Sequence, residues 1–302
     1  MYTDPKNTGN HAASISDHIK SIPQYVLPQH QLSKLMHTIT RSRNPRLKNF
    51  LISKIIKLYN VDMSLALEEK PEAYETFNAF FTRELKSSVR PIATGIEDIA
   101  CPVDGTVSQL GAIRDGEIFQ AKGKSFTTKQ LIGGNDAVAQ QFKNGCFATI
   151  YLSPKDYHRI HSPLDAKLIE MSHIPGKLFS VNPATTRAVN GLFARNERVS
   201  SIFETPVGLM AVVMVGAIFV SSVDTVWSGT VVPPYAKTVR HWQYTEDENR
   251  FIANKGDELG RFNMGSTVVL LFQEGRVNFS PTLSNGNTVK MGEKIGDFYH
   301  IT

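Results

Sequence analysis

The chain has 302 residues, of which 41% are hydrophobic and 20% are charged, and its 21 glycines and 15 prolines are close to average usage. This composition excludes disordered and collagen-like chains and is typical of one or two compact units with a sizeable core. The two cysteines, Cys101 and Cys146, exclude a disulfide framework and favour a reducing compartment.

Positive charge is concentrated near the start of the chain. Residues 18–61 contain no Asp or Glu but hold eight Lys and Arg, so the rest of the chain carries −3 of the total of +5. Residues 1–13 are polar and are predicted to be disordered. They lack the apolar stretch of a secretory signal and the Arg-rich pattern of a transit peptide, so we expect no export.

Two amphipathic helices are predicted within the basic stretch. Their apolar residues recur at helical spacing, first at Leu32, Leu35, Met36 and Ile39, and then, after Asn44-Pro45, at Leu47, Phe50, Leu51, Ile55 and Leu58. Two interpretations are open. The helices either pack on a core as ordinary surface helices or lie in a membrane interface, with the apolar face in lipid and the basic residues on anionic headgroups. The absence of acidic residues favours the second interpretation.

A short helix is also predicted over residues 71–85, with Tyr74, Phe77, Phe80 and Phe81 on its apolar side. After Arg90 the pattern changes, because Val, Ile and Phe now alternate with Gly and Asn-Gly turns. We therefore expect an α+β protein in two parts. A helical front segment (residues 1–90) precedes a mainly antiparallel, β-rich domain (residues 91–302).

The most apolar run covers residues 207–223 and contains no charge over 17 residues, which is near the lower limit for a membrane span. It is rich in Val, contains Gly208 and Gly216, and has turn or polar residues at both ends. These features favour one or two buried strands over a spanning helix.

Two segments carry acid–base side chains. Asp104 stands in a Val-Asp-Gly sequence that ordinarily forms a turn. His158 and His161 are three residues apart, but Pro154 and Pro163 leave little room for a helix that would align them as metal ligands. No metal is therefore predicted. Paired imidazoles also suit an acid and a base, because their unperturbed pKa lies near 6.5.

A third segment contains Gly265-Ser266-Thr267 before a buried strand. A tight turn that leads into the strand would explain why Gly and Ser stand together here. Because Gly265 lacks a Cβ, its backbone can also adopt strained dihedral angles that expose its carbonyl to the Ser266 hydroxyl. A base near Ser266 would then drive attack on the preceding peptide bond.

In this order and spacing the three segments resemble the phosphatidylserine decarboxylase family, in its bacterial membrane-associated form. The resemblance runs from about Phe77 to the C-terminus and includes the stretches 77–85, 157–163, 181–183, 192–199, 214–217 and 265–267. One position departs from the family pattern, since Met264 stands where Leu is usual. The two side chains are similar in volume and polarity, so we expect processing to survive.

The resemblance implies a proenzyme that cuts itself between Gly265 and Ser266, giving chains of 265 and 37 residues. It assigns three roles: Asp104 orients His161, His161 takes the proton of Ser266, and the Ser266 oxygen attacks the Gly265 carbonyl. Elimination then releases the front chain, and the remaining dehydroalanine hydrolyses to a pyruvoyl group with loss of ammonia.

The resemblance also implies pyruvoyl-dependent decarboxylation of phosphatidylserine to phosphatidylethanolamine. The covalent pyruvoyl group derived from Ser266 would bind the substrate amine and accept the electron pair left by carbon dioxide. His158 is the expected donor of the proton that the product carbon then needs. No external cofactor is expected.

A substrate with two acyl chains favours the interfacial interpretation of the front segment. Lipid contacts are expected from the stripe of the second helix, and headgroup contacts from Arg41, Arg43, Arg46 and Lys48. The expected partners are phosphatidylserine, an anionic membrane surface and a second copy in a homodimer of processed pairs, with no nucleic acid. The expected location is peripheral, on the cytoplasmic face of a bacterial inner membrane.

Two alternatives remain open. A pyruvoyl-dependent decarboxylase of a soluble amino acid would share the chemistry of Ser266 but would not need the basic helices. A non-catalytic, lipid-binding relative would keep an uncut chain.

Overall fold

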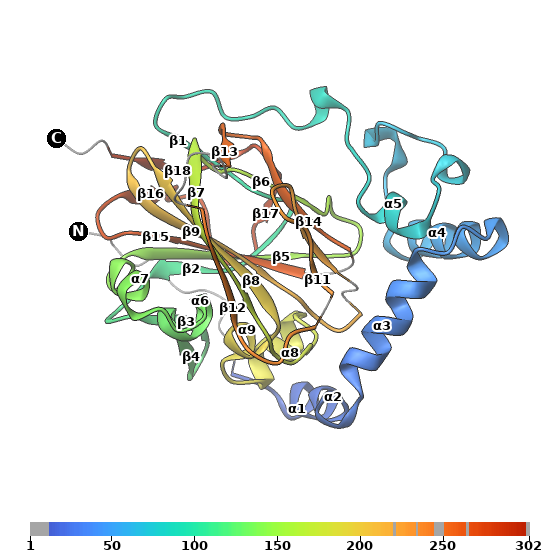
Figure 1. Ribbon diagram of the computed structural model, residues 1–302, viewed down its shortest axis with the longest axis horizontal. Coiled ribbons are helices and arrows are strands. Elements are labelled where there is room, and N and C mark those ends of the chain that lie inside the picture. The colour runs from blue at the N-terminus through green and yellow to red at the C-terminus, as the bar shows by residue number, and fades with distance from the viewer. Residues whose placement is uncertain (1–11, 220–221, 234, 245–250, 264–265, 300–302) are drawn as a thin grey trace.

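The computed structural model describes residues 12–219, 222–233, 235–244, 251–263 and 266–299. Short helices come first and mainly antiparallel sheets follow, which confirms the predicted α+β class (Figure 1). Among the described residues, no helix is both long and apolar enough to span a bilayer. Most of the segment predicted to be disordered, residues 1–11, lies outside the described ranges, and the division at residue 90 stays a prediction.

The helices of the front segment follow one another along one side of the sheets (Figure 1). They are α1 (Ile15–Ser21), α2 (Pro23–Val26), α3 (Gln29–Thr40), α4 (Pro45–Tyr59) and α5 (Phe77–Phe81), with 3-10 turns at Met63–Leu65, Pro71–Ala73 and Ser87–Val89.

The beginning and end of α4 follow from its sequence. Asn44 precedes the helix, and its side-chain oxygen accepts hydrogen bonds from the backbone N–H groups of Arg46 (3.0 Å) and Leu47 (3.2 Å). Pro45 occupies the first helical position, where no backbone N–H is needed. The helix ends at Asn60, which adopts the left-handed conformation with φ of 52°.

The helix predicted over residues 71–85 is interrupted. Pro71–Ala73 form a 3-10 turn, and α5 begins only at Phe77. The cause is local, because the Thr76 side chain accepts a hydrogen bond from Ala79 N (3.0 Å) and so starts a new helix.

α4 and α5 enclose a small apolar cluster that is separate from the main core. Its buried members are Ile52, Val61, Tyr74, Phe77, Phe80 and Phe81. Leu51 and Ile55 pack against this cluster, so the prediction that they enter lipid is wrong. The side chains of α4 that remain exposed from the predicted stripe are Leu47, Phe50 and Leu58.

Two of the side chains that were predicted to contact headgroups also point into the protein. Lys48 is buried, and its ammonium donates to Glu72 O (2.8 Å). Arg41 donates from Nη2 to the hydroxyl of Ser222 (2.8 Å). Both cations therefore satisfy protein acceptors, and the prediction that they contact headgroups is wrong for them, whereas Arg43 and Arg46 remain exposed.

The remaining chain is built around a nine-stranded antiparallel sheet. The strand order is β12-β7-β8-β9-β15-β5-β2-β17, and β13 pairs beside β7. The strands are β2 (Gly105–Ala112), β5 (Cys146–Leu152), β7 (Ala166–Ile174), β8 (Arg198–Thr205), β9 (Gly208–Val215), β12 (Arg240–Gln243), β13 (Ile252–Ala253), β15 (Ser266–Phe272) and β17 (Thr288–Val289).

Three smaller sheets and four helices accompany the large sheet. The sheets are β11 (Gly229–Val232), β10 (Val223–Thr225), β14 (Glu258–Phe262) and β6 (Arg159–His161); β1 (Asp98–Ala100), β18 (Lys294–Phe298) and β16 (Val277–Phe279); and β3 (Glu117–Ala121) with β4 (Lys124–Thr127). The helices are α6 (Thr128–Ile132), α7 (Asp136–Gln141), α8 (Pro183–Ala188) and α9 (Leu192–Arg195).

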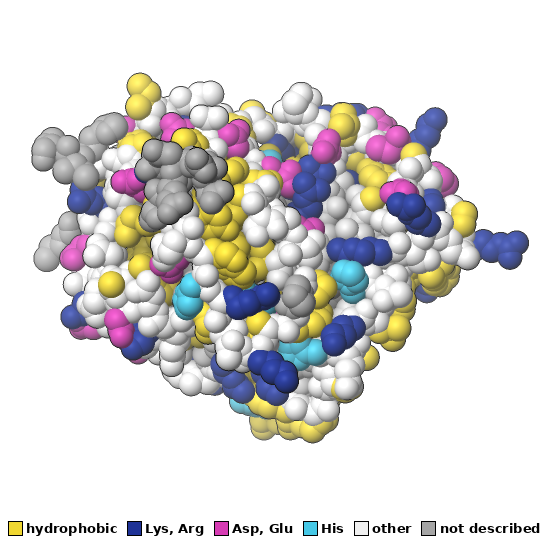
Figure 2. Space-filling model, in the orientation of Figure 1, with side chains coloured by type: hydrophobic (Ala, Val, Ile, Leu, Met, Phe, Trp, Pro, Cys, Tyr) yellow, Lys and Arg dark blue, Asp and Glu magenta, His cyan; other side chains and the backbone are white. Residues whose placement is uncertain are grey.

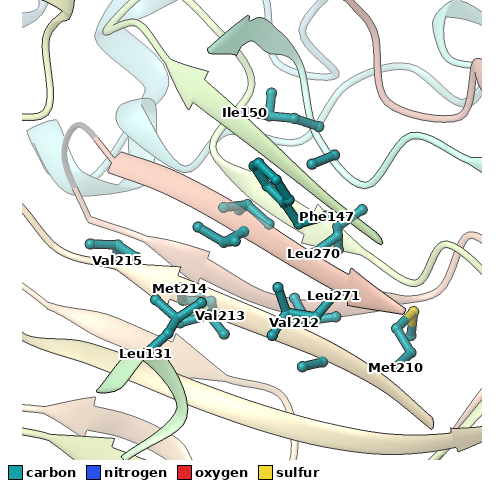
Figure 3. Packing of buried hydrophobic residues seen from close by; sticks show 14 of the residues in the cluster. Leu131, Phe147, Ile150, Met210, Val212, Val213, Met214, Val215, Leu270 and Leu271 are labelled. Carbon is teal, nitrogen blue, oxygen red and sulfur yellow. The ribbon is translucent and has the colours of Figure 1, made fainter. Parts of the chain in front are cut away.

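β15 lies at the centre of the main core. All seven of its residues are buried, and it pairs with β5 on one side and β9 on the other. Figure 3 shows Leu270 and Leu271 of β15 among Phe147 of β5 and Val212 of β9. The apolar run at residues 207–223 supplies β9 and the start of β10, so the prediction of buried strands is confirmed.

Candidate active site

Backbone hydrogen bonds bring the three predicted segments together. β6, which contains His161, pairs with β14, which leads toward Ser266. His161 N donates to Pro102 O (2.9 Å), two residues before Asp104, and Phe262 N donates to His158 O (3.1 Å). Segments separated by about a hundred residues in sequence therefore meet at one end of β15.

Ser266 is the first residue of β15 and is fully buried opposite Leu152 of β5. Its Oγ atom has no hydrogen-bond partner among the residues that the structure describes. Buried hydroxyl groups are ordinarily paired, so this unpaired oxygen marks a position that needs a chemical explanation. Gly265, the other residue of the predicted cleavage site, lies outside the described residues, as does Met264 before it.

His158 is fully buried and held in one tautomer. Its Nδ1 lies 2.8 Å from Asp156 O, and because a carbonyl can only accept, the proton must be on Nδ1. The lone pair is then on Nε2, which is buried and has no hydrogen-bond partner within the described part of the chain. Burial lowers the pKa of His158 to about 3, so the ring is neutral at physiological pH and carries a free lone pair.

His161 is oriented by two different groups. Its Nδ1 lies 2.8 Å from Gly256 O, which again assigns the proton to Nδ1, and its Nε2 lies 3.1 Å from the hydroxyl of Tyr157. Burial lowers the pKa of His161 and raises that of Tyr157 to about 12, so the neutral forms of both are favoured. Tyr157 therefore donates to Nε2, which has the lone pair that a base needs.

Asp104 is buried beside these histidines, but its carboxylate is bound elsewhere. It accepts hydrogen bonds from Nε of Arg90 (2.8 Å) and from Met291 N (2.9 Å), and Nη2 of Arg90 completes a two-pronged ion pair. Among the described residues, no hydrogen bond joins Asp104 to His161. The proposed role of Asp104 in orienting His161 therefore stays a prediction.

A polar cavity of about 140 Å³ lies between the end of α4 and these residues. Asp156 lines it, and burial raises the pKa of this carboxyl group although Ser153 N donates to it (2.7 Å). The cavity is lined by Asn60, Val61, Asp62, Leu65, Arg83, Leu85, Arg90, Asp104, Lys155, Asp156, Tyr157 and Lys290. The front segment thus forms one wall of the space in front of Asp104.

The sequence did not single out Arg90, Asp156 or Tyr157 as site residues. Asp156 and Tyr157 directly precede His158, so their place in that run was an available signal. Arg90 gave no such signal, because its contact with Asp104 depends on the path of the intervening chain. Within the described ranges, no group of three or more His, Cys, Asp or Glu is arranged to hold a metal ion.

Known proteins resemble this chain over most of its length. A family model described as "Phosphatidylserine decarboxylase" matches residues 77–297, and a second, described as "PSD", matches residues 19–60. A phosphatidylserine decarboxylase proenzyme of Methylococcus capsulatus is 50% identical over 273 residues, which cover 90% of this chain and 94% of the relative. The proenzyme of Alkalilimnicola ehrlichii is 54% identical over 255 residues, covering 84% and 88% of the two chains.

Proposed function

The chain belongs to the phosphatidylserine decarboxylase family, and we propose that it converts phosphatidylserine to phosphatidylethanolamine after cutting itself between Gly265 and Ser266. The observation that carries the proposal is the buried, unpaired Ser266 hydroxyl at the meeting point of the three segments. A buried serine hydroxyl is suited to act as a nucleophile when a neutral imidazole from the neighbouring segment takes its proton.

In the cleavage step, the Ser266 oxygen attacks the Gly265 carbonyl carbon, and its proton passes to Nε2 of His161, which first releases the hydrogen bond that it accepts from Tyr157. The peptide C–N bond breaks and an ester forms in its place. Elimination then releases residues 1–265 with an ordinary carboxylate, and the dehydroalanine left at residue 266 takes up water and loses ammonia. Asp104 is the proposed third member of this group, and its buried carboxylate is paired with the guanidinium of Arg90.

The resulting pyruvoyl group supplies a ketone that binds the substrate amine and accepts the electron pair left by carbon dioxide. A buried end of β15 fits such a group, because the surrounding strands exclude water. His158 is the proposed proton donor to the product carbon. A substrate carboxylate beside its ring would favour the imidazolium form, which can deliver a proton from Nε2.

We propose that the protein acts from the surface of an anionic membrane on the cytoplasmic face, as a homodimer of processed pairs. Apolar side chains on α1 and α2 support this proposal, since Ile15, Ile19, Ile22 and Val26 are each more than 60% exposed. Their spacing of four, three and four residues is helical, so the sequence contained this signal although the prediction did not use it.

Figure 2 shows yellow hydrophobic side chains at the lower edge, where Figure 1 places α1 and α2, with dark blue Lys and Arg above them. An apolar edge beside cations suits the boundary between headgroups and acyl chains. Phe50 and Leu58 of α4 add a second exposed apolar group to the front segment.

Turnover of three substrates by the purified protein tests the proposal. We expect release of carbon dioxide from phosphatidylserine in liposomes and none from free serine or aspartate. Activity on a free amino acid would instead support the soluble-substrate alternative. An uncut and inactive chain would support the non-catalytic alternative.

A further inference from the structure

Asn263 is fully buried and comes immediately before Met264, Gly265 and Ser266. Its backbone N–H donates to Ser222 O (3.0 Å). Its side-chain amide donates to the hydroxyl of Ser222 and to Oδ2 of Asp224 (2.8 Å). Backbone and side chain are therefore both attached to one stretch of the chain, residues 222–224, at the point where the polypeptide enters the cleavage site.

The same Ser222 hydroxyl also contacts the front segment. Arg41, the residue that ends α3, donates from Nη2 to Ser222 Oγ (2.8 Å). A hydroxyl oxygen has two lone pairs and can accept from Arg41 and Asn263 together. The result is a continuous set of hydrogen bonds that runs from α3, through Ser222, to the residue before the cleavage site.

Asp224 is the acidic group next to this contact. Burial lowers the pKa of Arg41, and the negative charge of Asp224 opposes that lowering; burial and the charge of Arg41 lower the pKa of His37, which Asp224 likewise opposes. On the opposite side, Asp224 of β10 pairs in register with Arg261 of β14. The carboxylate therefore lies between a cation of the front segment and the strand that leads to Ser266.

We propose that Arg41 and Asn263 are positioning residues for self-cleavage, which fix the backbone at residue 263, three residues before the attacking hydroxyl of Ser266. This inference rests on the proposed function, because it concerns the same peptide bond. A misplacement of about 1 Å of reacting atoms can cost about a hundredfold in rate. The front helix α3 is thus a structural part of the cleavage centre as well as part of a membrane-docking segment.

Asn263→Asp tests the role of the side-chain amide. The change is isosteric, but it removes the donor to Ser222 and places a second carboxylate beside Asp224. We expect self-cleavage, followed by gel electrophoresis of freshly made chain in lipid-free detergent buffer, to slow at least tenfold. Adding Asp224→Asn exchanges donor and acceptor across the same contact, so the double variant should regain most of the lost rate.

Arg41→Met tests the contact from the front segment and keeps side-chain length at a partly buried position. We expect cleavage to slow about threefold to tenfold, as for loss of one hydrogen bond. Lys143→Gln is the matched control, because it removes one positive charge from an exposed side chain far from the site, and it should cleave at the wild-type rate.

The melting temperature of each variant, measured in an uncleavable Ser266→Ala background, separates positioning from misfolding. Wild-type cleavage rates in Asn263→Asp and Arg41→Met would overturn the inference and leave the proposed function standing. A double variant that melts like the wild type but cleaves no faster than Asn263→Asp would also overturn it. If Asn263→Asp does not fold, Arg41→Met decides the outcome. A wild-type chain that stays uncut would overturn the proposed function itself.

Discussion

Helix α3 of the front segment and strand β15 of the β-rich part bury opposite kinds of side chain. Every residue of β15 is buried among apolar neighbours. Helix α3, in contrast, buries Gln29 and Ser33 and leaves Leu35 57% exposed. The sheets are therefore stabilised by removal of apolar surface from water, whereas α3 turns polar groups toward the sheets and apolar groups away from them.

Hydrogen bonds make up part of the contacts of α2 and α3 with the rest of the protein, alongside the ring contact of Tyr25 with Phe179. Gln29 accepts a hydrogen bond from Leu178 N (2.7 Å), and Gln24 accepts one from Ser180 N (2.8 Å). Water can replace such bonds, so each contributes only about 1 kcal/mol. The difference teaches that the front segment is oriented by hydrogen bonds, which leaves its apolar side available for lipid.

The largest expected effect is confined to the buried end of β15. Ser266→Ala removes the nucleophile, and we expect complete loss of cleavage and of decarboxylation, measured by gel electrophoresis and by carbon dioxide release. His161→Ala should also leave the chain uncut. Ser280→Ala, at a serine remote from the site, should cleave normally. Normal cleavage in Ser266→Ala would remove that residue from the mechanism.

A second variant tests whether the front segment unfolds separately. Phe80→Ala empties a fully buried position in the cluster of α4 and α5, which should cost about 3 to 5 kcal/mol. Hydrogen exchange should accelerate in α4 and α5 and stay unchanged in β5 and β15. Phe203→Ala, in the main core, is the matched control and should accelerate exchange throughout. A uniform change in both variants would contradict two separately stabilised regions.

The buried His158 predicts a pH dependence of stability. Its pKa in the fold is about 3, below the unfolded value near 6.5, so the unfolded chain binds more protons between these values. The contribution of His158 to the free energy of unfolding is present above pH 6.5 and is lost as the pH falls toward 3. In the uncut Ser266→Ala chain, lowering the pH from 7 to 5 should cost about 2 kcal/mol through His158 in urea unfolding.

His158→Gln in the same background provides the comparison, because glutamine does not titrate. The free energy of unfolding of this variant should depend less on pH by the same amount. An unchanged pH dependence would show that His158 is not held neutral by burial. In the otherwise native chain, His158→Gln should be processed but poorly active if His158 serves only decarboxylation.

The smallest expected effect concerns the outer side of the front segment. Ile19→Ser should weaken binding to anionic vesicles about tenfold, because it removes part of the transfer free energy of one exposed apolar side chain. Ile96→Ser, at a still more exposed position after the front segment, should bind normally. Higher salt should weaken binding of both proteins. Equal binding by the two variants would argue that α1 does not enter lipid.

Much of the fold could be predicted from the sequence because local patterns determine it. The start of α4 at Asn44-Pro45 and the continuous apolar run of β15 can be recognised from the sequence alone. The directions in which the side chains of Arg41 and Lys48 point could not be predicted, because periodicity defines the face of a helix but not which part of the protein covers that face. The pairing of Asp104 with Arg90 likewise depends on tertiary geometry, so the sequence indicated the segments of the site but not all their side-chain contacts.

Intact mass spectrometry of the purified protein tests the central claim most directly. The account predicts a fragment of 37 residues, beginning at residue 266, whose mass is lower than that of the serine-initiated peptide by one ammonia. A protein that decarboxylates phosphatidylserine while residue 266 remains an unmodified serine would contradict the account.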